Sequence, residues 1–248
     1  MKKIVLFAFC SLLITSVFAQ VQDSTATRTN YSSGNTKISL ANRANDHFLL
    51  QLGYTGWAGI PDSINTRGLS KSLNFYLMFD FPFKTNPKLS MAFGPGIGSD
   101  QIQFKKTYVG IKEQTSLLQF RDQADTNHFK RTKLSTVYLE APIEFRYTHN
   151  ALNPNKSLKA AIGVKVGTMI NAHTRNKTLQ SSNGGTLNDY LMKESSKKYF
   201  NTTRLVGMAR LGLGHFSLYG SYQLTNLFKE GVAAEVRPYS IGLTLSGL

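Results

Sequence analysis

Between residues 48 and 248 the chain alternates apolar and polar residues in eight separate runs. In residues 71–81, for example, Leu73 and Phe75 alternate with Asn74 and Tyr76. Alternation with period two is typical of β-strands whose two faces meet different environments. The pattern therefore predicts strands over residues 48–57, 71–81, 88–104, 134–148, 157–170, 202–212, 215–225 and 236–247.

The connections between these runs alternate in length. The segments 58–70, 105–133, 171–201 and 226–235 are long, and they are separated by the shorter segments 82–87, 149–156 and 213–214. In an up-and-down barrel every second connection lies at the same end, and outer-membrane barrels have long extracellular loops and short periplasmic turns. The sequence thus predicts an eight-stranded antiparallel up-and-down transmembrane β-barrel with both termini in the periplasm.

A soluble lipocalin-like barrel is the alternative, because it shares the strand number but turns its apolar face inward. The polar face here is rich in Gly, Ser, Thr and Tyr, whereas a soluble exterior carries denser Lys and Glu. The lipocalin Gly-x-Trp signature is missing, since Trp57 directly follows Gly56. Aromatic residues near the strand ends predict interfacial girdles; they are Phe48, Tyr54, Trp57, Phe81, Tyr147, Tyr222 and Tyr239. These features favour the membrane barrel.

The first 46 residues are predicted to lie outside the barrel. Residues 1–19 have the charged start, apolar centre and small-residue cleavage site of a secretory signal peptide. Residues 20–46 are polar and are expected to form a periplasmic lead-in segment. The barrel domain is expected to span residues 47–248. Cys10 lies in the predicted signal peptide, so the mature chain would have neither disulfides nor cysteine-bound metals.

Residues 137–147 contain the pattern Tyr-Leu-Glu-x-Pro, and residues 163–167 contain the pattern Gly-x-Lys-x-Gly. These two stretches resemble the "YLE-x-P" and "GxKxG" strands of PorT-like outer-membrane β-barrel proteins of the Bacteroidota, and residues 219–231 and 238–243 resemble the closing hairpin of that family. The resemblance implies an eight-stranded outer-membrane barrel; some relatives serve secretion or gliding machinery, and most have no assigned activity.

Isolated charges on the polar face predict a network inside the barrel. The predicted inward charges are Asp80, Glu140, Glu144, Arg146, Lys159, Lys165, Arg204 and Arg210. An eight-stranded barrel has room for little more than its own side chains, and a buried charge must be paired. We therefore expect a salt-bridge network that plugs the lumen. A narrow ion or proton path is the alternative.

No motif predicts catalysis, a cofactor or a metal site. Glu140 and Glu144 are about 13 Å apart along a strand, too far for a carboxylate pair of the retaining type. His215 and Ser217 share a strand face, as in barrel enzymes that deacylate lipid A, but no partner acid is evident and the site lies at the periplasmic end. The five histidines show no ligand spacing.

The net charge of +15 favours anionic partners. The loops 105–133 and 171–201 are both net basic, so lipopolysaccharide phosphates and an envelope protein are the expected partners of these loops. Nucleic acid is not expected, because the signal peptide exports the chain and no basic recognition helix appears. We expect an exported outer-membrane monomer with a structural or interaction role.

Overall fold

The computed structural model describes residues 47–62, 64–151 and 153–247. The predicted signal peptide and lead-in segment lie outside the described residues. The strands are β1 (Phe48–Ala58), β2 (Thr66–Leu77), β3 (Phe79–Pro82), β4 (Leu89–Phe93), β5 (Gly96–Phe104), β6 (Thr107–Val109), β7 (Phe120–Asp122), β8 (His128–Thr148), β9 (Leu158–Gln180), β10 (Thr186–Ser195), β11 (Thr203–Leu213), β12 (Phe216–Gln223) and β13 (Arg237–Ser246). The 3₁₀ turn η2 spans Pro154–Lys156. Within the described ranges, no helix is long and apolar enough to cross a membrane.

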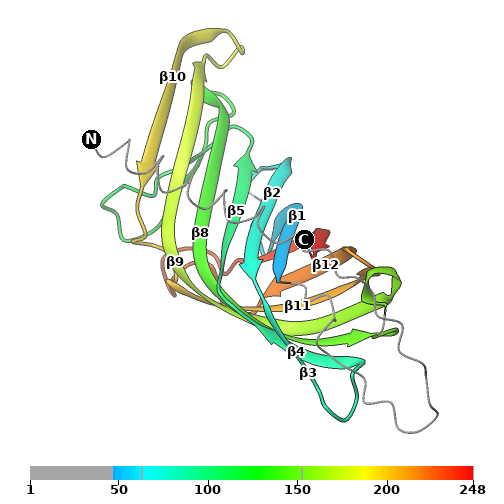
Figure 1. Ribbon diagram of the computed structural model, residues 1–248. Coiled ribbons are helices and arrows are strands. Elements are labelled where there is room, and N and C mark those ends of the chain that lie inside the picture. Colours follow the sequence, from blue (N-terminus) through cyan, green and yellow to red (C-terminus); the bar gives the residue numbers. More distant parts are fainter. Residues whose placement is uncertain (1–46, 63, 152, 248) are drawn as a thin grey trace, which may run out of the picture. The chain divides into compact units, whose positions relative to one another are not determined.

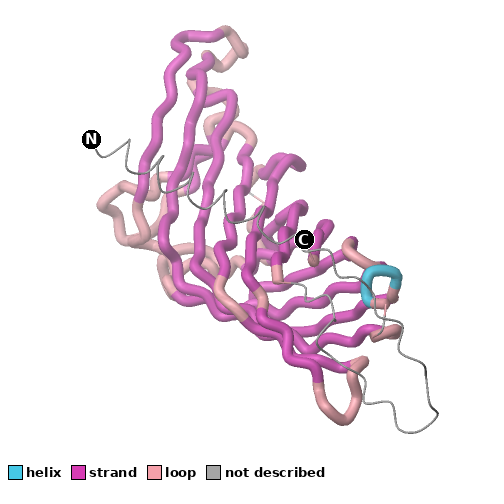
Figure 2. Tube along the Cα trace, in the orientation of Figure 1, coloured by secondary structure: helices cyan, strands magenta, loops and turns pink. Residues whose placement is uncertain are grey.

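Eight antiparallel strands close into a ring in the order β1-β2-β5-β8-β9-β11-β12-β13 (Figures 1 and 2). The ring closes between β1 and β13, whose register runs without a shift from Leu49 opposite Ser246 to Ala58 opposite Arg237. Strands β3 and β4 continue β2 and β5 beyond local breaks. The predicted eight-stranded antiparallel up-and-down barrel is thus confirmed.

The break between β4 and β5 falls at Gly94 and Pro95, opposite Ala141 and Pro142 of β8. Proline cannot donate to a strand ladder, so two prolines at one point interrupt the hydrogen bonding there. Gly94 is needed because a Cβ atom at this position would clash with the carbonyl oxygen of Leu77. The sheet can therefore bend at this point without leaving the ring.

The barrel carries its apolar face outward. Leu52, Phe75 and Ile162 expose 55%, 44% and 65% of their surface, whereas Gln51 and Asn74 on the opposite face each expose 2%. A soluble barrel would have the reverse distribution, so the lipocalin-like alternative is wrong. Most of the predicted girdle residues point outward, but Trp57 does not: it is buried at 9% exposure. The reason is strand parity, because Trp57 lies an even number of residues from inward-facing Gln51 and Thr55.

The predicted loops 105–133 and 171–201 contain more sheet than expected. Strand β8 begins at His128 and β9 continues to Gln180, where a turn leads into β10. Strand β10 pairs only with β9 among the described strands and lies outside the ring, and Figure 1 shows β8, β9 and β10 running on past the other strands. The short strands β6 and β7 form a separate hairpin. Apolar alternation failed to predict these extensions because strand segments beyond a bilayer have no apolar face.

Two ends of the barrel are distinguished below. The short-turn end carries the connections 83–88, 149–157 and 214–215, together with the start of β1 and the end of β13. The long-loop end carries the connections 59–65, 105–127, 181–202 and 224–236, including β6, β7 and β10.

Candidate functional site

Glu144 organises a charged cluster inside the barrel near the short-turn end. Its Oε2 atom accepts hydrogen bonds from Arg146 Nε at 2.7 Å and from Arg210 Nη2 at 2.9 Å. Arg146 also lies 3.5 Å from Asp80, which accepts a hydrogen bond from Ser90 at 2.7 Å. This Glu144 cluster joins residues of β3, β4, β8 and β11 and is almost entirely buried.

Glu140 organises a second cluster, about 13 Å closer to the long-loop end. Its Oε1 atom lies 2.7 Å from Arg204, and its Oε2 atom accepts a hydrogen bond from Tyr76 at 2.5 Å. Lys165 donates to the Tyr76 hydroxyl at 3.1 Å and lies 3.8 Å from Glu140. Arg204 binds Asp100 as well, at 2.7 Å. We call this set the Glu140 cluster.

Arg204 of the Glu140 cluster contacts three side chains, namely Glu140, Asp100 and Tyr138. Besides its two carboxylate partners, its guanidinium carbon lies 3.7 Å from the ring centre of Tyr138. A guanidinium stacked on an aromatic face gains a cation–π attraction that strengthens with desolvation. Arg204 thereby fixes β11 to β5 and β8 through the interior rather than through backbone bonds.

The structure brings seven of the eight predicted charges into the two clusters. The eighth, Lys159, is half-buried at the short-turn end of β9, on the same face as Lys165 and in register with Thr148. The predicted charge network did not include Asp100, which strand parity places inward, and it did not include Tyr76 and Tyr138, which the alternation places on the polar face. With Asp100 included, each cluster holds two acidic and two basic side chains. Each cluster is therefore neutral, as buried charges require.

Small residues make room for these large side chains. A Cβ atom at Gly98 would lie 2.6 Å from Glu140 Oε2 and 2.8 Å from Arg204 Nη2. Contacts this short require one of the partners to move, and both are held by ion pairs. The glycine-rich stretch of β5 thus accommodates the Glu140 cluster.

Little space remains between the side chains. A cavity lined by Asp100, Lys165 and Arg204 has a volume of about 10 Å³, and a cavity beside Glu144 and Arg210 has about 0 Å³. A single water needs about 10–15 Å³. The interior has no room there for a continuous column of water.

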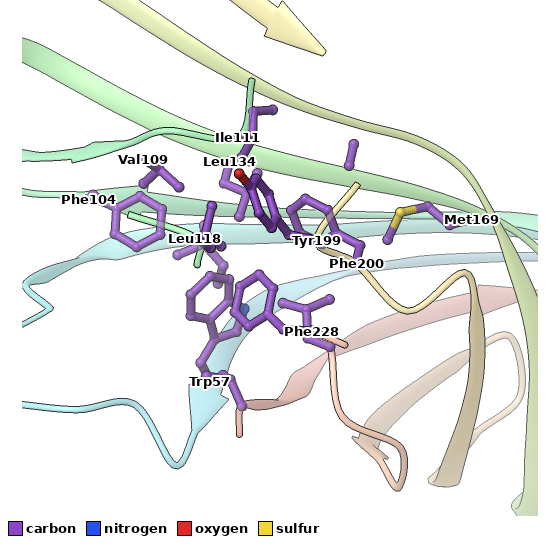
Figure 3. Packing of buried hydrophobic residues seen from close by; sticks show 14 of the residues in the cluster. Trp57, Phe104, Val109, Ile111, Leu118, Leu134, Met169, Tyr199, Phe200 and Phe228 are labelled. Atoms are coloured by element: carbon purple, nitrogen blue, oxygen red, sulfur yellow. The ribbon is translucent and has the colours of Figure 1, made fainter. Parts of the chain in front are cut away.

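An apolar cluster closes the long-loop end above the Glu140 cluster. Residues of the strand ends and of three long connections share it: Trp57, Ile102, Phe104, Val109, Ile111, Leu118, Leu134, Tyr138, Met169, Ala172, Tyr199, Phe200, Leu227, Phe228 and Val236. Figure 3 shows the rings of Trp57, Tyr199 and Phe228 gathered at its centre. The ring centroid of Trp57 lies 5.6 Å from that of Phe104 and 5.7 Å from that of Phe228. We call this cluster the aromatic lid.

Hydrogen bonds tie the lid segments to one another. The Tyr199 hydroxyl donates to the carbonyl oxygen of Glu113 at 2.6 Å. The backbone N–H of Leu118 donates to the carbonyl oxygen of Val232 at 2.8 Å. Asn201 donates from its side chain to the carbonyl oxygens of Asn226 and Phe228. The three long connections are thus cross-linked into one layer.

Nothing in the described ranges has the arrangement of a metal centre. The His215 ring lies 2.9 Å from the backbone oxygen of Ser246, and Ser217 is buried at 5% exposure. Both residues lie at the short-turn end. Their surroundings indicate a packing role at the junction of β12 and β13.

An antiparallel ring with an apolar exterior and an interior filled with paired charges defines a small transmembrane β-barrel. The comparison with protein families gives the same class: the chain belongs to the family described as outer membrane protein beta-barrel domain, whose model matches residues 18–230. The protein is therefore an outer-membrane β-barrel protein. Among solved structures, the attachment invasion locus protein Ail of Yersinia pestis is similar, with 15% sequence identity over 80% of this chain and 97% of that chain and a TM-score of 0.30. No curated protein matches the sequence.

Proposed function

We propose that this protein is a non-conducting outer-membrane barrel that acts through its long-loop end, as an envelope component or as a partner of a secretion-type assembly. The observation that carries the proposal is the closed interior: two neutral charge clusters fill the lumen and the aromatic lid covers it. A barrel filled in this way has no path for solute, so its accessible surfaces are its loops and outer wall. The proposed role is non-enzymatic.

The proposal includes export by the signal peptide, with both termini in the periplasm. The short-turn end then faces the periplasm and the long-loop end faces outward, which is the usual arrangement of outer-membrane barrels. The segments 105–133 and 171–201, which contain the longest connections of the barrel, lie at the outward end. The monomeric state is part of the same proposal.

The proposal also includes membership of the PorT-like branch of the Bacteroidota. The "YLE-x-P" strand supports it, because its residues have distinct physical roles in this barrel. Tyr138 stacks on Arg204, Glu140 accepts the hydrogen bonds that hold the Glu140 cluster together, and Pro142 lies opposite the break between β4 and β5. A pattern with these roles describes how the barrel is filled and bent.

Single-channel recording in planar bilayers tests the closed lumen. The folded wild-type protein, identified by its heat-modifiable gel shift, should give no steady conductance. The narrow transport channel is the opposing outcome: steady wild-type conductance that falls on Glu144→Gln or Arg204→Ala would refute a plugged barrel.

Site-specific photocrosslinking in intact cells tests which end interacts. A crosslinker placed at exposed Lys198 should capture an envelope protein, whereas one placed at exposed Lys84, at the short-turn end, should not. Capture from Lys84 alone would refute the outward interaction face.

A further inference from the structure

Three basic side chains lie directly opposite one another on the extended part of the sheet. Lys133 of β8 pairs in register with Arg175 of β9, and Arg175 pairs with Lys193 of β10. We call these three residues the basic ladder. Like charges directly opposite each other on neighbouring strands destabilise a sheet. An anion bound across the ladder would remove this repulsion.

The ladder belongs to a wider basic area on the outer wall. Its cations lie on the outward face of the sheet formed by β2, β8, β9 and β10; they are Lys71, Arg131, Lys133, Arg175, Lys177 and Lys193. All are exposed except half-buried Lys133. Within the described part of the chain, no carboxylate forms an ion pair with a residue of the ladder. The acidic residue of β10 nearest to the ladder, Glu194, accepts a hydrogen bond from Tyr108 instead.

The titration of neighbouring groups reflects the same repulsion. These groups lie beyond the apolar band of the barrel. Burial, together with Arg131, Lys71 and Arg175, lowers the pKa of Lys133. Burial, together with Lys193 and Arg175, lowers the pKa of His173.

The height of the ladder fits the headgroup layer of a bilayer. Toward the long-loop end, the last strongly exposed apolar residue of β8 is Leu139, at 48% exposure. Lys133 lies six residues nearer to that end, which is about 20 Å of strand. In a strand tilted by about 45° this corresponds to about 14 Å along the membrane normal. Phosphate groups of the outer leaflet would thus lie at the level of the ladder.

An apolar groove opens on the same wall below the ladder. It has a volume of about 620 Å³ and lies between Phe79 and Phe93 on one side and Val166 on the other, with Ala141 and Ile143 at its base. The groove arises where Pro95 and Pro142 interrupt the backbone hydrogen bonding between strands. Ala141, which is smaller than its neighbours, leaves room there. Its lining is apolar, and it faces the hydrocarbon region.

We propose that the outer wall binds one phosphate-bearing lipid of the outer leaflet, with its phosphates on the basic ladder and one acyl chain in the groove. The assignment rests on the proposed function in one respect, the outward orientation of the long-loop end. A membrane lipid combines both chemistries: phosphate oxygens match lysine and arginine, and an acyl chain matches an apolar groove. Inorganic phosphate can use the ladder alone.

Calorimetric titration of the detergent-solubilised full-length protein tests the headgroup site. The probes are diphosphorylated lipid A, the same lipid without its phosphates, and inorganic phosphate. The test variant is Lys133→Gln/Arg175→Gln/Lys193→Gln. The control is Lys84→Gln/Lys88→Gln/Lys156→Gln, which removes the same charge from exposed positions at the short-turn end.

We expect the wild type to prefer the phosphorylated lipid and to bind inorganic phosphate far more weakly. The ladder variant should lose roughly a hundredfold in affinity, since one surface cation contributes about fivefold toward an anionic lipid, and the control should change less than twofold. Equal binding of both lipids, equal losses in the two variants, or inorganic phosphate binding as tightly as the lipid would overturn the proposal.

A second pair of variants tests the groove. Ala141→Phe fills it, whereas Ala209→Phe adds the same ring to the lipid-facing wall of β11. Ala141→Phe should weaken lipid A binding several-fold and leave the binding of inorganic phosphate unchanged, and Ala209→Phe should change neither. Equal effects of the two would remove the groove from the site. The conductance measurement tests the two proposals separately. Steady conductance of the wild-type protein would refute the proposed closed lumen, whereas equal binding of phosphorylated and dephosphorylated lipid A would refute only this inference.

Discussion

Replacement of Arg204 by methionine is the sharpest test of the filled lumen. Methionine keeps much of the length and apolar volume but removes the charge. The change leaves Glu140 and Asp100 without the partner that lies 2.7 Å from each, and it removes the stacking on Tyr138. Lys165 is then the one cation left in the Glu140 cluster, facing two carboxylates.

The expected magnitude follows from this imbalance. Breaking a buried ion pair by removing one partner costs about 3–5 kcal/mol, because the other charge stays buried without compensation. We expect Arg204→Met to lower the free energy of unfolding by about that amount. Glu140→Gln should cost a similar amount, because it leaves the two cations Arg204 and Lys165 with Asp100 as the one carboxylate of the cluster. The double variant restores neutrality, so its loss should be smaller than the sum of the two by about 2 kcal/mol or more.

Urea-induced unfolding in lipid vesicles measures these values. The sole tryptophan, Trp57, reports on the lid directly above the cluster, and the heat-modifiable gel shift reports on the barrel. Arg237→Met, on an exposed arginine, is the control and should change the free energy by less than about 0.5 kcal/mol. Additive losses in the double variant would show that the cluster is not electrostatically coupled and would refute the reasoning.

Three further predictions concern other parts of the barrel. Phe228→Ala should cost about 3–5 kcal/mol of unfolding free energy and shift the emission of the sole tryptophan to longer wavelength; an unshifted emission would contradict the lid packing. Gly98→Ala should cost about 1–3 kcal/mol through overpacking against Glu140, seen as a lower midpoint of the heat-modifiable gel shift, and an unchanged midpoint would contradict it. His173 should titrate below its usual value of about 6.5, and Lys193→Gln should raise that pKa; proton NMR of the imidazole measures both, and an unchanged pKa would contradict a cationic environment.

The fold was predictable from sequence because a bilayer imposes a strict period on each strand that crosses it. Alternation placed Glu140, Glu144 and Arg204 inward without any knowledge of their partners. The same parity rule places Asp100, in the middle of β5, and Trp57, near the end of β1, inside the barrel, although the predicted network did not include Asp100 and Trp57 was expected in an outer girdle. Parity is therefore sufficient to place the members of the Glu140 cluster within the membrane.

The long-loop end was less predictable for a physical reason. Beyond the bilayer both faces of a strand meet water, so residues 128–133 and 171–180 continue the sheet without an apolar period. Those lid residues that lie in the connections, such as Ile111 and Tyr199, are subject to no periodic constraint. Their burial depends on three connections that meet only in the folded chain, and a single sequence contains no signal for that meeting.

The distribution of charge links the closed lumen to the outer wall. The two clusters hold four acidic and four basic side chains and contribute nothing to the net charge of +15. The whole surplus therefore lies elsewhere, and on the extended sheet it gathers in rows where each cation faces another, although a mixed arrangement would stabilise the strands better. An ion path would need open space inside the barrel, where the cavities beside the two clusters have only about 10 Å³ and about 0 Å³, whereas a surface for an anionic partner needs uncompensated positive charge outside. The observed charge distribution is that of a surface for an anionic partner, so we expect the function of this barrel to reside on its outer wall and loops.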